Sequence, residues 1–340
     1  MSMPIAEAET RAGRKSWIDV IQKDLPEHLE WWPYTLGAIP LTLFGLLITT
    51  GLLLTFYYVP SPEKAYESVD HITHEVYLGW FVRGLHKTSV DLMILFLMFH
   101  VIRVFLTRAY RDSGEMKWVS GSIVLFVTLA MAFTGYSLVY DNVSYWGMTV
   151  VTNMMGTLPV VGRPLLTLLR GGEDVSGVTL LRLYDLHTKL LPLVLGGLVL
   201  GHVLLVRLIG FAEVEGSRGF HAFYPEHTMK MGAIALGLLL FIVDLVMIFP
   251  PLLGIPANPQ EVASDVSPPW YFSTPYMWIS LLPGPLALWT LMGAAALFVT
   301  YPFADRELAR RGWPMTWVNA VLAAGAVIVT VLLMYLDTRM

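Results

Sequence analysis

The chain has 340 residues, of which 55% are hydrophobic and only 14% charged, and its formal net charge is −4. Soluble globular proteins carry about 25% charged residues, so this chain cannot cover a water-facing surface and most of its exterior must face lipid. The high hydrophobic content also excludes a disordered or collagen-like protein. The negative net charge and the lack of a basic tail exclude a nucleic-acid-binding protein. The sequence contains no cysteine, which excludes disulfides, thiolate metal sites, cysteine-bound iron–sulfur clusters and thioether-linked haem.

Seven stretches are long and apolar enough to cross a membrane as helices, which needs about 20 residues each. Residues 31–62 and 271–304 hold 32 and 34 residues without Asp, Glu, Lys or Arg. These patterns predict an all-α integral membrane protein with seven transmembrane helices. The predicted helices cover about 36–58, 78–107, 118–140, 183–209, 231–250, 280–303 and 315–336.

Residues 142–162 are also uncharged and long enough to cross the membrane. They are rich in Asn, Ser, Thr, Gly and Pro, however, and they run into a Gly-Arg-Pro sequence at 162–164. Backbone that is not regularly helical is not tolerated against lipid. We therefore predict that this segment forms short helices along one membrane surface.

Lysine and arginine are concentrated on one side of the predicted topology, as expected of the cytoplasmic side. Of 22 such residues, 14 fall on that side, whereas the loop 251–280 has none and the loop 59–77 has only Lys64. We therefore expect the N-terminus in the cytoplasm and the C-terminus outside. Residues 1–30 lack the apolar core of a signal peptide and are predicted to be a cytoplasmic leader.

Two of the predicted helices each carry a pair of histidines. His86 and His100 are 14 residues apart, and His187 and His202 are 15 apart. Each pair spans roughly 21–22 Å along its helix and stays near one face. Because the two helices run in the same direction, His86 lies level with His187, and His100 with His202. Two stacked bis-histidine sites are what two haems need; the alternative, four separate buried histidines, does not explain the matched pairs.

The glycines on the other two helices of this four-helix unit repeat the same step. Gly37 and Gly51 are 14 residues apart, as are Gly121 and Gly135. A macrocycle between helices needs flat places where a backbone approaches, and only glycine leaves such a place without a side chain. The alternative is ordinary close packing of helices through small residues.

Four cations lie close to the histidines in sequence and are predicted counter-charges for haem propionates. They are Arg83, Lys87, Arg103 and Arg207. The competing role is to extend toward the lipid headgroups.

Several motifs, taken together, resemble the cytochrome b subunit of quinol–cytochrome c or quinol–plastocyanin oxidoreductases. They include FYYVPSPEKAYESV, GWFVRGLHK, FHVIRVFLT, SYWGMTVVTNMMGTLPVVG, LLRGGEDV, FYPEH, IPANP and SPPWYF. The match covers roughly residues 30–340, and the 15-residue histidine step resembles the plastid type fused to its subunit IV. The resemblance implies three parts: a leader at 1–30, a four-helix di-haem domain at 31–212 and a three-helix domain at 213–340.

The resemblance also implies cofactors and sites. Two non-covalent b-type haems would lie between His86 and His187 (outer) and between His100 and His202 (inner), with the four glycines against their faces. The inner quinone site would lie near Arg207 and the segment around Asp19, with the residues of the outer quinol pocket being Tyr145, Trp146, Gly147, Pro268, Pro269, Trp270 and Tyr271.

The function implied by the resemblance is that of a membrane subunit that oxidises quinol at the outer site. One electron would pass to a Rieske iron–sulfur protein or a c-type cytochrome, and the other through the two haems to the inner quinone site, with protons translocated. The resemblance further implies a homodimeric complex, embedded in lipid, in the inner membrane of a prokaryote.

The sequence departs from the family where a proton acceptor is expected. The family's Pro-Glu-Trp-Tyr motif reads Pro268-Pro269-Trp270-Tyr271 here, so its carboxylate is absent. A quinol that loses electrons must pass its protons to a group within hydrogen-bond reach. Asp265, four residues before Pro269, is a candidate if the loop folds inward; the alternative is a solvated loop acid.

Two other functions remain open from the sequence. A Rieske-less complex would keep both haems and exchange electrons with multihaem cytochromes or iron–sulfur subunits, without electron bifurcation. A haem-free seven-helix transporter or receptor is the third class, and a bis-histidine haem spectrum would exclude it.

Overall fold

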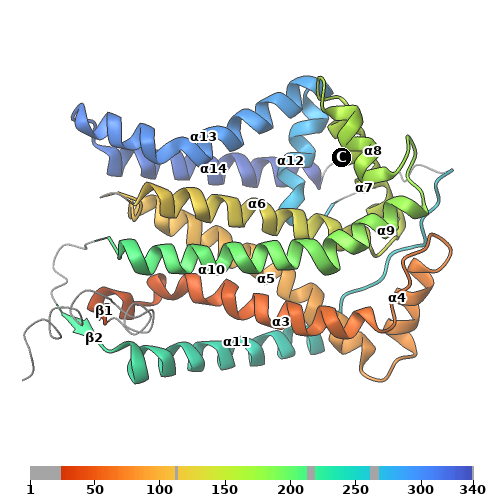
Figure 1. Ribbon diagram of the computed structural model, residues 1–340, viewed down its shortest axis with the longest axis horizontal. Helices are drawn as coiled ribbons and strands as arrows, with labels where there is room; N and C mark the ends of the chain where they lie inside the picture. The colour runs from red at the N-terminus through yellow and green to blue at the C-terminus, as the bar shows by residue number, and fades with distance from the viewer. Residues whose placement is uncertain (1–23, 112–113, 213–218, 261–267, 339–340) are drawn as a thin grey trace, which may run out of the picture.

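The computed structural model describes residues 24–111, 114–212, 219–260 and 268–338, and in them it confirms the seven-helix membrane architecture. Within these ranges, seven helical segments are long and apolar enough to cross a membrane. Their main elements run roughly side by side (Figure 1) and are α3 (Ala38–Thr55), α5 (Gly79–Leu106), α6 (Glu115–Ser137), α10 (Leu191–Ile209), α11 (Thr228–Ile248), α13 (Gly284–Arg310) and α14 (Met315–Asp337).

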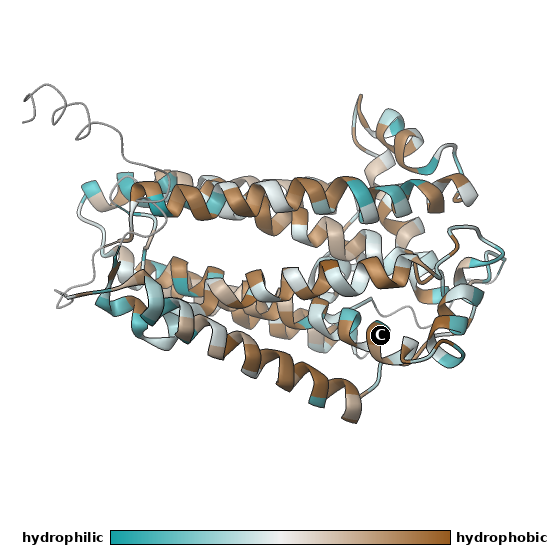
Figure 2. Cartoon of the chain, turned by 60° about the horizontal axis from the view of Figure 1, so that its bottom comes forward, coloured by the Kyte–Doolittle hydropathy of each residue, from teal (hydrophilic) through white to brown (hydrophobic). Residues whose placement is uncertain are grey.

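The outward faces of these helices are apolar, as lipid requires. Large side chains such as Leu193, Leu200 and Leu236 are 60–76% exposed in the isolated chain. Figure 2 shows hydrophobic residues along the middle of the long helices and hydrophilic residues gathered at their two ends. A helix that is apolar all round is a membrane span rather than the surface helix of a soluble protein.

The two ends of the bundle differ, and each is named here by its elements. At the α7 end lie α4 (Ala65–His74), α7 (Asn142–Gly156), α8 (Gly162–Arg170) and α9 (Gly177–Asp185) (Figure 1). With 15 residues, α7 is shorter than the roughly 20 needed to cross. The prediction that 142–162 forms short helices outside the transmembrane set is therefore confirmed.

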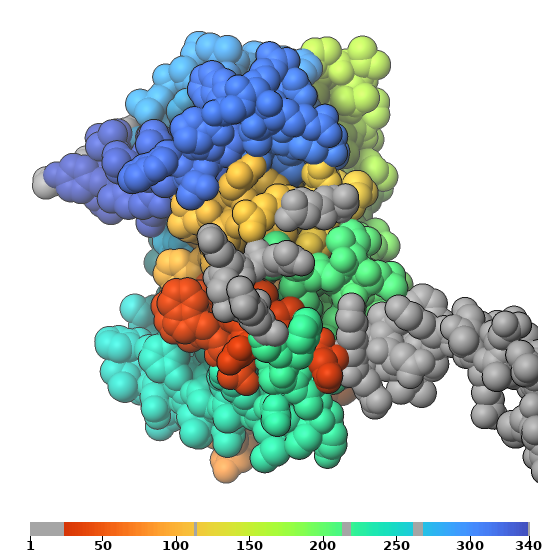
Figure 3. All heavy atoms as spheres, turned by 90° about the vertical axis from the view of Figure 1, so that its left-hand side faces the viewer, coloured from red at the N-terminus to blue at the C-terminus, as the bar shows by residue number. Residues whose placement is uncertain are grey.

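At the opposite end, called the ribbon end, the start of the described chain meets the segment after α10. Here β1 (Leu25–Pro26) pairs antiparallel with β2 (Phe220–His221). The 3-10 helices η1 (Glu27–Glu30) and η2 (Trp32–Gly37) follow β1, and the π turn η4 (Phe223–His227) follows β2. Figure 3 views the molecule from this end and shows the red N-terminal segment beside the green segment around β2.

Helix α3 packs along α5, and α6 along α10, which builds the predicted four-helix unit. Helix α11 covers the outside of α3 and α5 through a core of Leu43, Met93, Leu238, Ile242 and Val246. A Cβ atom added at Gly84 would lie 2.5 Å from Val246 Cγ1. The close approach of α5 and α11 therefore requires glycine at this position.

A buried polar cluster at the ribbon end joins α13 and α14 to the end of α5. Asp305 is 2% exposed, pairs with the Arg108 guanidinium and accepts a 3.1 Å hydrogen bond from the Tyr110 hydroxyl. Asn319 donates to the Tyr110 hydroxyl at 2.8 Å. These partners explain why α13 continues to Arg310, beyond the end predicted at 303, although its last turns are charged.

Candidate functional site

The four predicted ligand histidines lie inside the four-helix unit at two levels. His86 and His187, toward the α7 end, have ring centroids 6.4 Å apart at an interplanar angle of 75°. His100 and His202 lie toward the ribbon end, against Gly37 and Gly121 respectively. Metal–imidazole bonds are about 2 Å long, so two imidazoles on opposite sides of one metal have ring centroids about 6.3 Å apart. The separation of His86 and His187 therefore fits one metal ion between them.

A π turn accounts for the unequal histidine spacing. His187 lies in η3 (Leu186–Leu190), where the Leu191 amide bonds to the Leu186 carbonyl five residues earlier. A π turn adds one residue to an α-helix. The 15-residue step from His187 to His202 therefore acts like the 14-residue step on α5, and both members of the pair face the same way.

Each of the four predicted glycines contacts one ligand histidine on the neighbouring helix. A Cβ atom at Gly37 or Gly51 would lie 3.1–3.2 Å from the Cε1 of an α5 histidine, and one at Gly121 would lie 3.1 Å from that of His202. At Gly135 it would lie only 2.5 Å from His187 Cε1 and 3.0 Å from its Nε2. The glycines thus keep space for the rings of these histidines; their contact with haem faces remains a prediction.

Three hydroxyl groups, which the sequence analysis missed, orient three of the histidines. Oγ1 of Thr50 lies 2.9 Å from His86 Nδ1 and Oγ1 of Thr134 lies 3.1 Å from His187 Nδ1. Each hydroxyl donates its own hydrogen to a helix carbonyl, so its oxygen accepts the Nδ1 hydrogen. A histidine that donates from Nδ1 presents Nε2 as a neutral ligand atom.

The third of these hydroxyl groups is that of Ser120, 2.8 Å from His202 Nδ1. The sequence signal was available, since a Thr or Ser stands directly before three of the four glycines. Leu36 precedes the fourth, Gly37. Correspondingly, in the described part of the chain His100 Nδ1 is buried without a hydrogen-bond partner.

The four cations predicted to pair with haem propionates differ in the contacts that they already make within the chain. Arg103 has a buried Nε without a partner among the described residues, and its guanidinium lies 5.0 Å over the ring of Tyr34. Arg207 stacks 4.4 Å over Phe223. The Arg103 guanidinium is therefore able to pair with an additional anion near His100. The four imidazoles and the Arg103 guanidinium are groups of the kinds that two haems with propionates would use.

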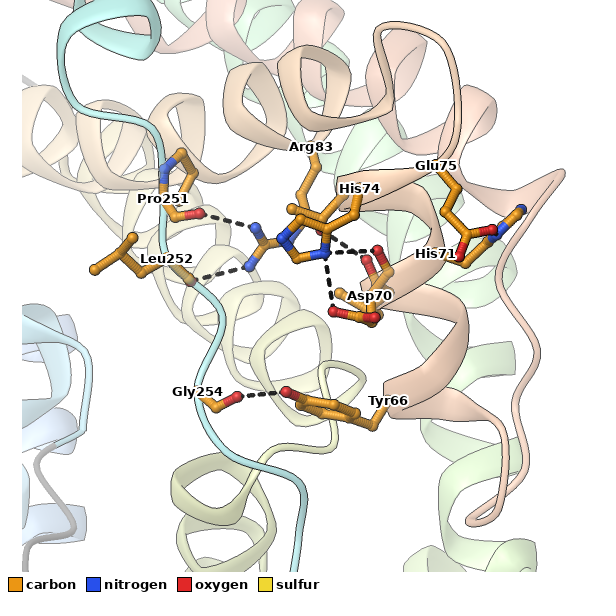
Figure 4. Close-up of polar contacts among 11 residues, drawn as sticks. Tyr66, Asp70, His71, His74, Glu75, Arg83, Pro251, Leu252 and Gly254 are labelled. Carbon is orange, nitrogen blue, oxygen red and sulfur yellow. Dashed lines mark hydrogen bonds and ion pairs between the residues drawn. The ribbon is translucent and has the colours of Figure 1, made fainter.

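Arg83 and Lys87, the other two predicted partners, are engaged elsewhere. Arg83 donates to the Pro251 and Leu252 carbonyls at 2.9 and 3.1 Å, which ties α5 to the segment after α11 (Figure 4). In the same segment, Gly254 accepts a 2.7 Å hydrogen bond from the Tyr66 hydroxyl. Lys87 pairs with Asp91 at 2.5 Å. A propionate role for Arg83 or Lys87 stays a prediction, and it would require these contacts to be shared.

The two motifs predicted to wall the quinol pocket meet on one stretch of α6. Helix α12 (Trp270–Leu281) begins at Trp270-Tyr271, and Phe272 packs on Phe133 of α6 with ring centroids 6.4 Å apart. Three residues later on α6, the buried hydroxyl of Tyr136 faces Gly147, where a Cβ atom would lie 3.2 Å from it. Both motifs therefore lie beside Gly135, which contacts His187.

Not every residue of these motifs is placed to line the predicted quinol pocket. The Tyr145 side chain is 8% exposed and belongs to the core that Leu180 and Leu183 form with α7. Burial raises the pKa of the Tyr145 hydroxyl. Trp146 packs at the edge of the same core. Pro268 and Pro269 directly precede α12, and the predicted Asp265 and Asp19 lie outside the described residues.

Arg170, the arginine of the LLRGGEDV motif, holds the helices of the α7 end together. It is 3% exposed and donates to Thr152 Oγ1 at 2.8 Å, to the Thr149 carbonyl at 2.9 Å and to the Glu173 carbonyl at 2.7 Å. Burial lowers the pKa of its guanidinium, and the charge of Asp174 opposes that shift. The sequence could not indicate its partners, because they are mainly backbone carbonyls.

Known proteins match both the sequence and the fold. The family model described as cytochrome b/b6/petB matches residues 20–210. Cytochrome b6 of Synechococcus elongatus is 40% identical over 194 residues, which are 57% of this chain and 90% of that protein. Cytochrome b6 of Prochlorococcus marinus (strain MIT 9211) is 41% identical over the same length, 88% of that protein.

A solved structure extends the likeness of fold to the whole chain. A chain of a structure described as hyperthermophilic respiratory Complex III aligns with a TM-score of 0.76 and 22% identity, covering 99% of this chain and all of that one. The C-terminal helices thus share the fold of that protein as well. With the family model matched over more than half of its length, the chain belongs to the cytochrome b/b6 family, whose members bind haem b.

Proposed function

We propose that this chain is the di-haem, quinol-oxidising cytochrome b subunit of a bc-type complex. It would oxidise quinol at the α7 end and carry electrons through two b haems to a quinone site at the ribbon end, coupled to proton translocation. The observation that carries the proposal is the arrangement of four imidazoles in two pairs, each opposite a glycine. A haem bound at each level supplies a one-electron carrier inside the membrane.

The chain's own residues support two carriers at different depths. His86 and His100 lie about 21 Å apart along α5, and the π turn on the facing helix keeps its two histidines level with them. Thr50, Thr134 and Ser120 hold three of the imidazoles with Nε2 free to bind a metal. Such bonds to the second ring nitrogen fix the orientation of a ligand histidine.

The α7 end supports quinol binding, because two motifs converge there next to the histidine at the nearer level. Phe133 and Tyr136 on α6 contact the α12 and α7 motifs respectively. At the ribbon end, Tyr34 and Phe223 stack on arginines, and His221 lies 3.5 Å from His227. Aromatic, basic and titratable groups together suit a quinone that takes up protons.

The charge pattern and the family support a proposal for the orientation and the assembly. We place the ribbon end in the cytoplasm of a prokaryote, since it belongs to the side of the predicted topology that is richer in Lys and Arg, and the C-terminus outside. The partners would be a Rieske iron–sulfur protein, a c-type cytochrome or both, in a homodimeric complex. The division of the chain near residue 212 is supported by the end of the family match at 210.

The test is haem stoichiometry in the complex purified from native membranes. Wild-type complex should contain two b haems per chain, and His86→Leu and His100→Leu should each lose one, with different spectra for the haem that remains. His71→Leu is the matched control, because the His71 side chain on α4 is half exposed and pairs with Glu75. Two haems in either ligand variant would refute the proposal.

A second measurement separates bifurcation from the Rieske-less alternative, which Pro269 in place of the family's glutamate favours. With the inner quinone site inhibited, an oxidant pulse to quinol-poised complex should reduce the b haems further. That response requires the two electrons of one quinol to diverge. Haem reduction that ignores the pulse would favour the Rieske-less complex and leave the di-haem assignment standing.

A further inference from the structure

The segment that follows α11 crosses the α7 end of the bundle as an irregular chain. It consists of residues 251–258 and is called the strap here. Side chains of two helices that are distant in sequence hold its carbonyl groups (Figure 4). Arg83 of α5 donates to the carbonyls of its first two residues at 2.9 and 3.1 Å. The Tyr66 hydroxyl of α4 donates to the Gly254 carbonyl at 2.7 Å. These three bonds fix the path of the first half of the strap.

The second half of the strap is paired with the start of α7. The Asn142 amide donates to the Ile255 carbonyl at 2.9 Å, and Asp141 forms an antiparallel bridge with the next strap residue. Asp141 also caps α7, because its Oδ1 accepts a 2.8 Å hydrogen bond from the Ser144 amide. Its other carboxylate oxygen lies against the strap, since a Cβ atom at Gly254 would be 2.7 Å from Oδ2. The strap therefore has a fixed register against the first turn of α7.

That turn leads directly into the Tyr145-Trp146-Gly147 motif, which is predicted to wall the outer quinol pocket. Ala257 of the strap and Trp146 both pack against the buried core that includes Tyr145. On α7 itself, a Cβ atom at Gly147 would lie 3.1 Å from the Tyr136 ring of α6. A small displacement of the start of α7 would change this contact. The strap is thus a physical connection from α4 and α5 to the motif.

This inference rests on the proposed function: we propose that Tyr66 is a positioning residue for quinol binding at the α7 end. Its hydroxyl acts through the Gly254 carbonyl, and the strap in turn holds the first turn of α7 where the quinol motif meets α6. Without that hydrogen bond, the middle of the strap is held only by the bonds on either side of it. The quinol pocket is then complete in a smaller fraction of the molecules, and the apparent affinity for quinol falls by that fraction.

The test uses the whole complex purified from native membranes, with duroquinol as the electron donor. Tyr66→Phe removes only the hydroxyl group. The KM for duroquinol should rise roughly two- to tenfold, the factor to which the net free energy of one hydrogen bond corresponds, while kcat, haem content and haem spectra stay unchanged. Gly254→Ala pushes the same segment away from Asp141 and should raise KM at least as much. Arg83 is not used, because it is a predicted propionate partner and a change there would mix haem binding with the position of the strap.

Tyr301→Phe is the matched control, because it removes a tyrosine hydroxyl that donates to Asn319 Oδ1 at the ribbon end. It should lower the temperature of thermal unfolding but keep the wild-type KM. An unchanged KM in Tyr66→Phe, or an equal rise in Tyr66→Phe and Tyr301→Phe, would overturn the inference while leaving the proposed function intact. Loss of a haem in Tyr66→Phe would overturn it as well. If Tyr66→Phe does not assemble, Gly254→Ala is judged by the same criteria. Wild-type complex whose haems are not reduced by duroquinol would overturn both proposals.

Discussion

Gly135→Ala should remove the haem nearer the α7 end, because the added methyl group would enter the space of the His187 ring. Its Cβ would lie 2.5 Å from His187 Cε1, which is 0.9 Å short of the 3.4 Å at which ordinary contact begins. At Gly51, Gly121 and Gly37 the same shortfall is only 0.3, 0.3 and 0.2 Å. Functional groups must be held within about 0.5 Å of their productive geometry. Gly135 alone exceeds that tolerance.

The assay is a comparison of the four alanine variants by haem content and redox titration of the purified complex. We expect Gly135→Ala to bind one haem per chain, the one held by His100 and His202. The other three variants should bind two haems per chain with shifted midpoint potentials. The histidine ring beside each of these glycines can move by the few tenths of an ångström that the added methyl group requires. Gly45→Ala is the control, since nothing lies within 4 Å of a Cβ atom there.

The prediction fails if the four variants do not affect haem binding in the order that these distances give. Two haems with unaltered potentials in Gly135→Ala would show that the ring of His187 moves freely and that the contact does not constrain it. Loss of a haem in Gly37→Ala but not in Gly135→Ala would contradict the ranking by distance. Either result would refute the argument that glycine is needed here for the imidazole.

Two further predictions concern hydrogen bonds. Ser120→Ala should weaken haem binding at the ribbon-end level more than Thr134→Val does at the other level, within the 10–100-fold range typical of such partners. The reason is that the histidine beside Thr134 has a second acceptor, a backbone carbonyl at 3.1 Å; equal haem retention on dilution would contradict this. Asp305→Asn should lower the unfolding free energy by about 3 kcal/mol, since it leaves the half-buried Arg108 without its carboxylate. Thermal unfolding in detergent measures this, with Glu307→Gln as the control, and unchanged melting would be evidence against a structural role for the pair.

The sequence alone determined the class of the protein and the two levels of its paired histidines. Transfer of apolar residues into lipid depends on composition, so long apolar runs, four of them free of charge and three with isolated charges, located the seven spans without reference to any partner. Helix geometry has a constant rise and turn, so spacing alone placed His86 and His100 on one face. The polar composition of 142–162 was enough to exclude it from the spans. Each of these inferences uses properties of one segment at a time.

Only the tertiary structure decided which side chains form hydrogen bonds with each other. The π turn at His187, the hydroxyl partners of the imidazoles and the backbone carbonyls bound by Arg83 all join residues on different helices or depart from regular geometry. A hydrogen bond exists only when donor and acceptor come within about 3 Å, and the distances between helices are set by packing of the whole bundle.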